Sequence, residues 1–228
     1  MKIKLILISF ICVSSNTFAQ RLLSEEKRQE YKSYSYENNQ IIDIFSDSFN
    51  NGNVNNWNMG VSGESKGKIK NGSYFYTANW SSKENFTYQE IDFDTSKDFQ
   101  IEITIRPETK NKFIKIRFGA NGISNHQFLY KSDSEYRITE FNNEFGSKRS
   151  YIGPWYSGKG IINPGTSNKI TIRHIDNGFY FFVNGVFLQK KIYIKALPWY
   201  GSKIGFVVDN FSRENTNSIS EFKVSYLK

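Results

Sequence analysis

The chain contains 228 residues, of which 17% are aromatic, and its 16 Gly and 4 Pro exclude a low-complexity sequence. This length is sufficient for one all-β domain with a substantial hydrophobic core. The formal net charge of +8 favours acidic partners, such as uronic or sulfated polysaccharides, anionic lipids or nucleic acids.

Residues 1–19 are typical of a secretory signal peptide. Lys2 and Lys4 precede the apolar segment 5–13, and residues 17–19 supply a small-residue cleavage site before Gln20. The apolar segment is shorter than the ~20 residues that a membrane-spanning helix needs. We therefore expect an exported protein, in the periplasm, at the cell surface or outside the cell, with no membrane span and no intracellular nucleic acid as partner.

The predicted signal also contains the only cysteine, Cys12. The mature chain would therefore use neither disulfides nor thiol chemistry. The 30 Lys and Arg residues include Lys2 and Lys4, so 28 would remain against 22 Asp and Glu, a net charge near +6. The preference for acidic partners survives cleavage.

Short β-strands follow a polar segment, residues 20–43, which we expect to be a linker or a short helix. The expected strands are 44–49, 61–63, 66–70, 73–80, 86–93, 99–106, 113–118, 127–131, 136–141, 170–175, 179–183, 186–194, 204–207 and 222–226. Such strands at hairpin spacing, without helical periodicity, are typical of an antiparallel sandwich or barrel.

The clearest amphipathic strand is 99–106, where apolar residues alternate with Glu102, Thr104 and Arg106. Strand 113–118 has the same alternation. Extending it to the other strands predicts a core that contains Phe99, Ile101, Ile103, Ile105, Ile114, Ile116, Phe118, Ile170, Ile172, Phe206, Val208, Val224 and Tyr226.

A three-stranded meander is predicted for residues 168–194. Asp176, Asn177 and Gly178 separate its first two strands, and Asn184 and Gly185 separate the second from the third. Asn-Gly between β-rich segments is the strongest short hairpin signal, because both residues tolerate the positive φ that the turn requires.

This meander, with its aromatic strand ending in V-N-G, resembles that of the concanavalin A-like lectin/glucanase jelly rolls, which include the laminin-G-like domains. Residues 44–49 followed by Trp57 resemble the opening strand of that family, and 204–207 and 222–226 resemble its closing strands. The resemblance implies a jelly-roll sandwich of two antiparallel sheets over residues 44–228, with Trp57 in the core. The superfamily holds lectins, glycosidases, polysaccharide lyases and protein-binding modules, so the fold does not decide the function.

The sequence lacks the carboxylates of a glycosidase. The glucanase branch carries a closely spaced E-x-D-x-x-E, which places an acid and a nucleophile on one strand face. Here Glu102 is alone on its strand, Glu135 and Glu140 are not spaced in this way, and Asp92 and Asp94 stand at a strand end. The sequence thus favours a non-catalytic protein.

The lyase branch would require Tyr, His, Arg and Gln in particular strings. His126-Gln127 and Tyr136-Arg137 supply these residue types without the strings. We expect His126 to be exposed in a loop. His174 alternates with Ile170 and Ile172, so we expect a buried, hydrogen-bonded core histidine.

Several aromatic residues lie in or beside Gly/Pro-containing loops, where no strand core requires them. Exposed rings of this kind are candidate surfaces for stacking sugars. The candidates are Trp80, Tyr151, Trp155, Tyr156, Trp199 and Tyr200. The alternative is that these rings close the ends of the sandwich.

Basic residues occupy outward strand positions at Arg106, Lys115, Arg117 and Arg173. If their strands adjoin, they form one basic row, in which Arg117 and Arg173 hold carboxylate or sulfate groups bidentately. The alternative is a ladder of salt bridges on a solvated face.

Calcium is common in the resembled fold, where it often joins the first strand to the last. Asp47 and Asp209 stand near those two places and supply the hard oxygen ligands that Ca²⁺ prefers. Two carboxylates without a contiguous ligand loop leave the metal undecided.

The sequence favours a secreted carbohydrate-binding module, with acidic polysaccharide as its ligand. It leaves two alternatives open: a protein-interaction or structural domain of the laminin-G-like type, and a polysaccharide lyase or glycosidase.

Overall fold

The computed structural model describes residues 36, 40–62, 65–78, 85–108, 113–121, 124–131, 134–142, 149–163, 165–176, 178–192, 201–208 and 215–228. For residues 60–62, 142, 149–151 and 191–192 the description covers the backbone alone. The chain divides into Met1–Glu37 and Asn38–Lys228, and all the described strands belong to the second unit. The predicted signal peptide and most of the predicted linker lie outside the described residues.

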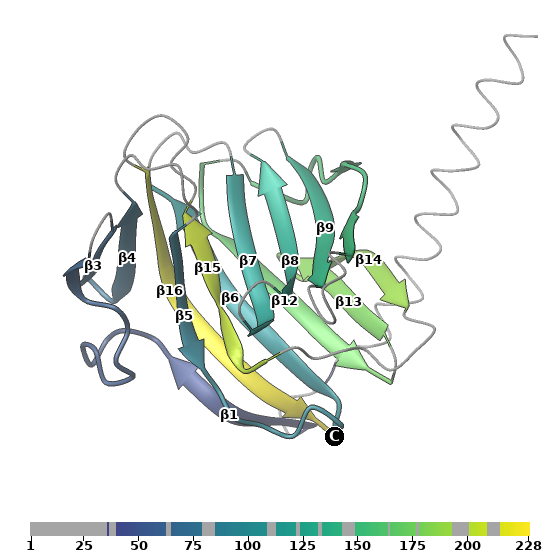
Figure 1. The fold of residues 1–228 in the computed structure, drawn as a ribbon, viewed down its shortest axis with the longest axis horizontal. Coiled ribbons are helices and arrows are strands. Elements are labelled where there is room, and N and C mark those ends of the chain that lie inside the picture. The colour runs from purple at the N-terminus through teal and green to yellow at the C-terminus, as the bar shows by residue number, and fades with distance from the viewer. Residues whose placement is uncertain are drawn as a thin grey trace, which may run out of the picture. The chain divides into compact units, whose positions relative to one another are not determined.

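Two antiparallel sheets make up the described part of this unit (Figure 1). The nine-stranded sheet has the order β14-β13-β12-β6-β16-β4-β3-β2, with β1 also paired to β16. Its strands are β1 (Ile41–Asp47), β2 (Gly60–Ser62), β3 (Ser65–Lys70), β4 (Ser73–Ala78), β6 (Phe99–Pro107), β12 (Asn168–Ile175), β13 (Gly178–Val183), β14 (Val186–Ile192) and β16 (Asn215–Leu227).

The seven-stranded sheet has the order β10-β9-β8-β7-β15-β5, with β11 also paired to β9. Its strands are β5 (Asn85–Glu90), β7 (Phe113–Asn121), β8 (Ser124–Lys131), β9 (Glu135–Asn142), β10 (Arg149–Ile152), β11 (Tyr156–Ser157) and β15 (Lys203–Val208). In Figure 1, β7, β8 and β9 pass in front of β6, β12 and β13. Among the described residues, no helix is long and apolar enough to cross a membrane.

The core lies between the two sheets. Its position follows from the two-residue period of strands, which sends alternate side chains to opposite faces. Twelve of the predicted core residues are buried; they are Phe99, Ile101, Ile103, Ile105, Ile114, Ile116, Phe118, Ile170, Ile172, Phe206, Val208 and Val224. The thirteenth, Tyr226, packs against the core only partly buried, and its hydroxyl accepts a hydrogen bond from the Asp94 backbone N–H at 2.8 Å.

The predicted meander is confirmed as β12, β13 and β14, at one edge of the nine-stranded sheet. Asn184 and Gly185 both have positive φ, 52° and 77°, and connect the paired residues Val183 and Val186. The Asn184 side chain also fixes the surrounding backbone, because its Nδ2 donates to Ile161 O at 2.8 Å and its Oδ1 accepts from Lys169 N at 3.0 Å. Asparagine therefore serves both the turn and the loop beside it.

The first strand begins at Ile41, three residues before the predicted start of the domain at residue 44. Ile41, Ile42 and Asp43 belong to the sheet because they pair with the last residues of β16. The predicted burial of Trp57 is confirmed, since its side chain is 2% exposed and packs against Phe222.

The prediction that His126 is exposed is wrong. Strand β8 begins at Ser124, before the predicted start at residue 127, so His126 continues the inward alternation of Phe128 and Tyr130. The imidazole is 1% exposed and stacks on Phe118 with ring centroids 5.4 Å apart.

His174 differs from the buried residue that the alternation predicts, because it is only half-buried at the end of β12. Its ring stacks on Phe99 with a centroid distance of 5.0 Å. Burial lowers the pKa of His174 below its ordinary value of 6.5, against smaller opposing effects of Asp98, the Lys97 backbone and Asp176.

This lowered pKa predicts a loss of folding stability at mildly acidic pH. The unfolded chain binds the imidazole proton more tightly than the folded state, so the contribution is complete above about pH 6.5 and declines as the pH falls below it. His174→Gln should remove this component, and its free energy of unfolding should change less than that of the wild type between about pH 7 and 5. Equal changes in the free energy of unfolding of both proteins, measured by urea denaturation, would contradict the assignment of this pH dependence to His174.

Candidate binding face

The register of the seven-stranded sheet defines which side chains share its outer face, because directly paired residues point to the same side. One transverse row runs through Tyr88, Gly205, Arg117, Gln127 and Thr139. The next row runs through Phe86, Val207, Lys115, Leu129 and Arg137. The residues between these rows, such as Ile116 and Phe206, point into the core.

Near β5, two basic side chains of this face form cation–π contacts with aromatic rings. The Arg117 guanidinium lies over the Phe86 ring, 4.8 Å from its centroid, and the Lys203 ammonium lies 4.7 Å from the centroid of Tyr88. Such cation–π contacts are worth about 0.5–1 kcal/mol at exposed sites and restrict where the cation can move. Tyr88 remains 39% exposed, so this end of the face presents an aromatic ring and two cations to the solvent side.

Trp155 occupies the other end of the face. It lies between β10 and β11, both of which pair with β9, and the hydrogen bond from Gly153 N to Ile138 O at 3.1 Å holds the preceding loop against that strand. The Lys131 ammonium and the Arg137 guanidinium lie over the Trp155 ring at 4.0 and 4.5 Å from its centroid. The indole therefore contacts cations from two neighbouring strands.

Basic side chains outnumber carboxylates on the described part of this face. Five are basic, namely Lys115, Arg117, Lys131, Arg137 and Lys203, and two are acidic, namely Glu90 and Glu135. Glu135 pairs with Lys131 at 2.5 Å. Glu90 lies opposite Lys203, but its carboxylate accepts a hydrogen bond from Ser202 Oγ at 3.1 Å and forms no ion pair with that lysine.

Two of these cations therefore have no carboxylate partner within the described part of the chain, Arg137 and Lys203. Lys115 points outward as predicted, yet it is buried at 6% exposure, with Leu129 and Val207 as its cross-strand neighbours.

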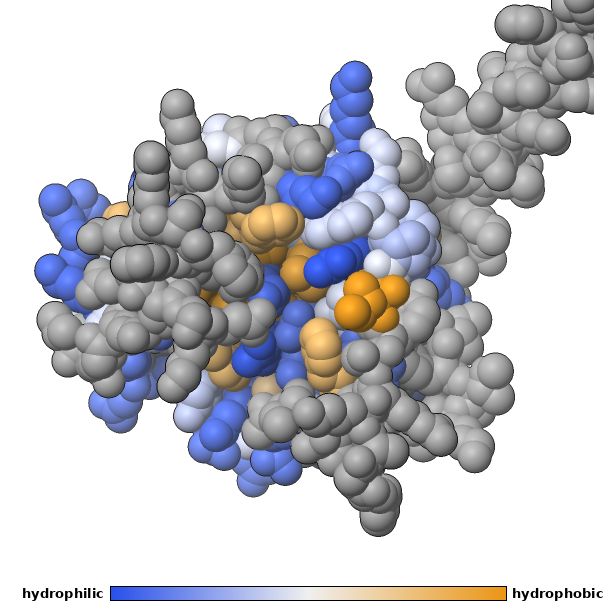
Figure 2. All heavy atoms as spheres, turned by 45° about the horizontal axis from the view of Figure 1, so that its top comes forward, coloured by the Kyte–Doolittle hydropathy of each residue, from blue (hydrophilic) through white to orange (hydrophobic). Residues whose placement is uncertain are grey.

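Figure 2 shows hydrophilic and hydrophobic residues interleaved over the coloured part of the surface.

Polar side chains between the two ends are held in place by each other. Gln127 Nε2 donates to Asn125 Oδ1 at 2.8 Å, and Thr139 Oγ1 donates to Gln127 Oε1 at 3.3 Å. All three residues are buried, so this chain of hydrogen bonds fixes the middle of the face.

The basic row considered for Arg106, Lys115, Arg117 and Arg173 does not form, because their strands belong to two sheets. Arg106 and Arg173 lie on adjoining strands β6 and β12 of the nine-stranded sheet, whereas Lys115 and Arg117 lie on β7 of the other sheet. Alternation defines inward and outward positions within a strand but not the sheet to which the strand belongs. Arg173 is thereby separated from the candidate face.

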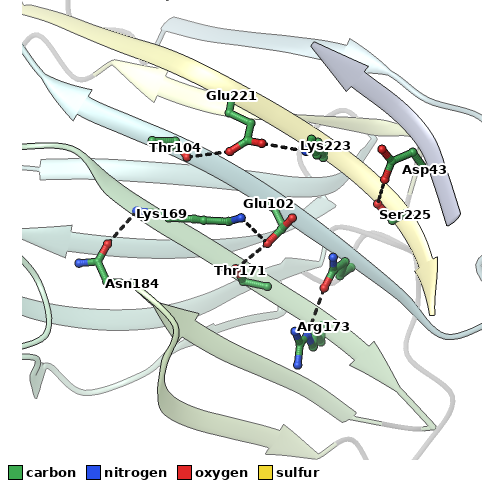
Figure 3. Close-up of polar contacts among 11 residues, drawn as sticks. Asp43, Glu102, Thr104, Lys169, Thr171, Arg173, Asn184, Glu221, Lys223 and Ser225 are labelled. Atoms are coloured by element: carbon green, nitrogen blue, oxygen red, sulfur yellow. Dashed lines mark hydrogen bonds and ion pairs between the residues drawn. The ribbon is translucent and has the colours of Figure 1, made fainter. Parts of the chain in front are cut away.

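The outer face of the nine-stranded sheet is instead the ladder of polar pairs that was the alternative interpretation (Figure 3). Glu102 pairs with Lys169 at 2.9 Å and accepts a hydrogen bond from Thr171 Oγ1 at 3.3 Å. Arg173 donates through Nε to Gln100 Oε1 at 3.1 Å. Glu221 pairs with Lys223 at 2.9 Å, an interaction that lowers the pKa of the carboxyl group.

Tyr156 is the only other predicted aromatic candidate whose side chain the structure describes, and it does not join Trp155. Tyr156 is 36% exposed, but it pairs with Tyr136 and stacks on that core residue at 5.6 Å, so it lies on the inner side of β9. The side chain of Tyr151 lies outside the described residues, as do Trp80, Trp199 and Tyr200.

Sequence reasoning missed several residues of the candidate face, namely Phe86, Tyr88, Lys131 and Lys203, and considered Arg137 only for a lyase. The two-residue alternation marks all but Lys203 as outward on their expected strands, but their assembly depends on β15, which begins at Lys203 and joins β5 to β7. No local sequence pattern specifies the pairing of β15 with β5 and β7.

Asp47, one of the two carboxylates considered for Ca²⁺, is held by hydrogen bonds within the chain. Its Oδ1 accepts a hydrogen bond from Phe49 N at 2.8 Å, and its Oδ2 accepts from Asn55 Nδ2 and Trp57 Nε1, both at 2.9 Å. Both carboxylate oxygens thus accept hydrogen bonds from within the chain. Asp209 lies outside the described residues, within which no group of three His, Cys, Asp or Glu could hold a metal.

The described carboxylates of the candidate face are too far apart for glycosidase chemistry. Glu90 on β5 and Glu135 on β9 are separated by four inter-strand steps, roughly 19 Å at the usual strand spacing. Catalytic carboxyl pairs lie about 5–10 Å apart. Glu102 belongs to the nine-stranded sheet and is paired with Lys169.

No protein-family model and no curated protein matches the sequence. Solved structures do match. A β-glucanase of Bacillus licheniformis aligns with a TM-score of 0.52 at 14% identity, over 81% of this chain and 97% of the glucanase. A Bacillus subtilis protein of unknown function with a galectin-like fold aligns with a TM-score of 0.56 at 12% identity, over 86% of this chain and all of its own.

This domain has the concanavalin A-like jelly-roll fold. Larger proteins contain similar units: the botulinum neurotoxin type G receptor binding domain aligns with a TM-score of 0.51 at 16% identity, over 80% of this chain. The jelly roll spans 47% of that toxin domain and 18% of a sialidase that aligns with a TM-score of 0.54 at 11% identity. These identities establish the fold alone, so function must be argued from the candidate face.

Proposed function

We propose that this jelly roll is an exported, non-catalytic carbohydrate-binding module whose ligand is an acidic polysaccharide. The observation that carries the proposal is that Trp155, with Lys131 and Arg137 over its ring, shares one sheet face with three further basic residues. The ligand would contact the two ends of the face, at Tyr88 with Lys203 and at Trp155, because the residues between them, such as Lys115 and Gln127, are buried.

The charge on the face supports an acidic ligand. Arg137 and Lys203 lack carboxylate partners in the described part of the chain, and they lie at opposite ends of the face. Uronate or sulfate groups repeated along a polymer would supply partners to both. Guanidinium groups suit this role, because they bind carboxylate or sulfate through two parallel hydrogen bonds.

The aromatic residues favour a carbohydrate ligand over a simple anion. Sugar rings have apolar faces that stack on aromatic side chains, and Tyr88 and Trp155 both retain exposure. Two of the jelly-roll neighbours, the β-glucanase and the sialidase, are named for action on carbohydrate. The predicted signal peptide would bring the module to polysaccharides outside the cytoplasm.

A glycan array with the mature chain tests the proposal. We expect binding to uronate- or sulfate-bearing glycans, weaker binding to neutral ones, and a decrease in affinity as salt is raised, because exposed charges are screened beyond about 8 Å at physiological ionic strength. Arg137→Gln and Lys203→Gln should each weaken binding. Lys228→Gln removes the same charge from the end of the chain and should leave binding unchanged.

Two outcomes would overturn the proposal. Absence of any glycan binding would favour the protein-interaction alternative. Release of unsaturated uronate ends, seen as new ultraviolet absorbance when a uronate polymer is mixed with the protein, would show a lyase.

A further inference from the structure

Three lysines lie in a row on β3, in the other sheet of the sandwich. Lys66, Lys68 and Lys70 alternate with inward-facing residues and are all exposed. Their partners on β4, Thr77, Phe75 and Ser73, are the outward residues of that strand. Since alternate residues of a strand are about 7 Å apart, the row presents three evenly spaced positive charges along a line.

Within the residues that the structure describes, these lysines lack the partners that other charged residues on the same outer face have. Figure 3 shows the ion pairs and hydrogen bonds that connect β1, β6, β12 and β16. At the end of β6, Arg106 pairs with Glu108 at 2.7 Å, and Ser218 Oγ also donates to that carboxylate. No ion pair involves the three lysines in the described residues, and the only aromatic contact is Lys68 over Phe75 at 5.6 Å.

We propose that Lys66, Lys68 and Lys70 form a second contact for acidic polysaccharide. Because the row is on the outer face of the nine-stranded sheet, it points away from the Trp155 face on the seven-stranded sheet. One chain can then hold two polymer strands and cross-link them. This inference rests on the proposed function, which supplies the ligand class.

A linear polyanion fits the row by charge and by shape. Three cations at regular spacing along one strand match negative groups that repeat along an extended polymer. Two separate contacts also raise the apparent affinity for a long polymer, since the second contact becomes intramolecular once the first has formed.

The competing explanation is protection of a sheet edge. Lysines on exposed strands prevent edge-to-edge association, and β2 covers only Ser65–Gly67, which leaves the rest of β3 at the edge. In that case the lysines would affect aggregation of the protein in polymer-free buffer but not its interaction with polymer.

Light scattering distinguishes these explanations when the mature chain is titrated with polygalacturonate of high molar mass. We expect the wild type to form cross-linked particles at intermediate ratios of protein to polymer. Lys66→Gln/Lys68→Gln/Lys70→Gln should lose this scattering, and its affinity for long polymer should fall by about 10-fold or more through loss of avidity. Its affinity for a short oligogalacturonate, which occupies one site, should stay within about twofold of the wild type.

The control removes three charges away from β3, with Lys97→Gln/Lys223→Gln/Lys228→Gln, and should still cross-link. Three results would overturn the inference: a lysine-row variant that cross-links like the wild type, a control that loses scattering equally, or a row variant that merely aggregates without polymer. A wild type that binds neither long nor short polygalacturonate, nor a sulfated polymer tried in its place, would instead overturn the proposed function.

Discussion

Asp47→Ala is expected to lower the free energy of unfolding by about 3 kcal/mol. The Asp47 carboxylate is 4% exposed and accepts hydrogen bonds from Phe49 N and Trp57 Nε1, both in buried surroundings. Removing an acceptor leaves each buried donor without a partner, at a cost of about 1–3 kcal/mol per group. The loss should appear as a lower midpoint in urea denaturation.

Asp43→Ala is the matched control for this substitution. Asp43 is exposed and accepts a hydrogen bond from Ser225 Oγ. Its removal opens that hydroxyl to water, which replaces the acceptor, so the loss should cost less than about 1 kcal/mol. Both variants should be measured with and without a calcium chelator. Equal losses in the two variants, or a loss at Asp47 that appears only when calcium is present, would contradict the structural role and restore the ion-binding one.

Trp155→Ala is expected to weaken binding of a uronate polymer on the order of 10- to 100-fold. The substitution removes a stacking surface and frees Lys131 and Arg137, whose charged groups lie 4.0 and 4.5 Å from the ring centroid. Cation–π contacts of about 0.5–2 kcal/mol and the loss of an aromatic stacking contact together give a change of this size. Titration calorimetry measures the affinity directly.

Two further variants separate the ring from its neighbours. Trp155→Phe keeps a ring beneath the cations and should lose less affinity than Trp155→Ala. Tyr156→Ala removes an exposed ring from the inner side of β9 and should change affinity by less than about twofold. If Trp155→Ala binds like the wild type, or if Tyr156→Ala loses as much affinity as Trp155→Ala, the Trp155 ring is not part of the site. Circular dichroism must show that each variant stays folded.

Much of the fold is predictable because it depends on local patterns. The alternation of Ile101, Ile103 and Ile105 already defines an inner face, and Asn184-Gly185 defines a hairpin. The error at His126 arose from a strand end, since starting β8 at residue 127 removed that histidine from the alternation.

The site was less predictable because it depends on contacts between distant strands. Arg117 and Arg173 have the same outward alternation, and only the pairing of β7 with β15 and of β12 with β6 assigns them to different sheets. Trp155 was recognisable as a candidate from its loop. Its contacts with Lys131 and Arg137 follow from the way two short strands pair with β9, which no local sequence pattern specifies.

The central claim is that the outer face of the seven-stranded sheet binds an acidic polysaccharide through its cations. Its most direct test is titration of a short oligogalacturonate into the wild type and into Arg137→Gln/Lys203→Gln at low and physiological ionic strength. We predict that the wild type binds, that its affinity falls as salt is raised, and that the double variant binds more weakly and with less dependence on salt. Equal affinity of the two proteins at both salt concentrations would contradict the claim.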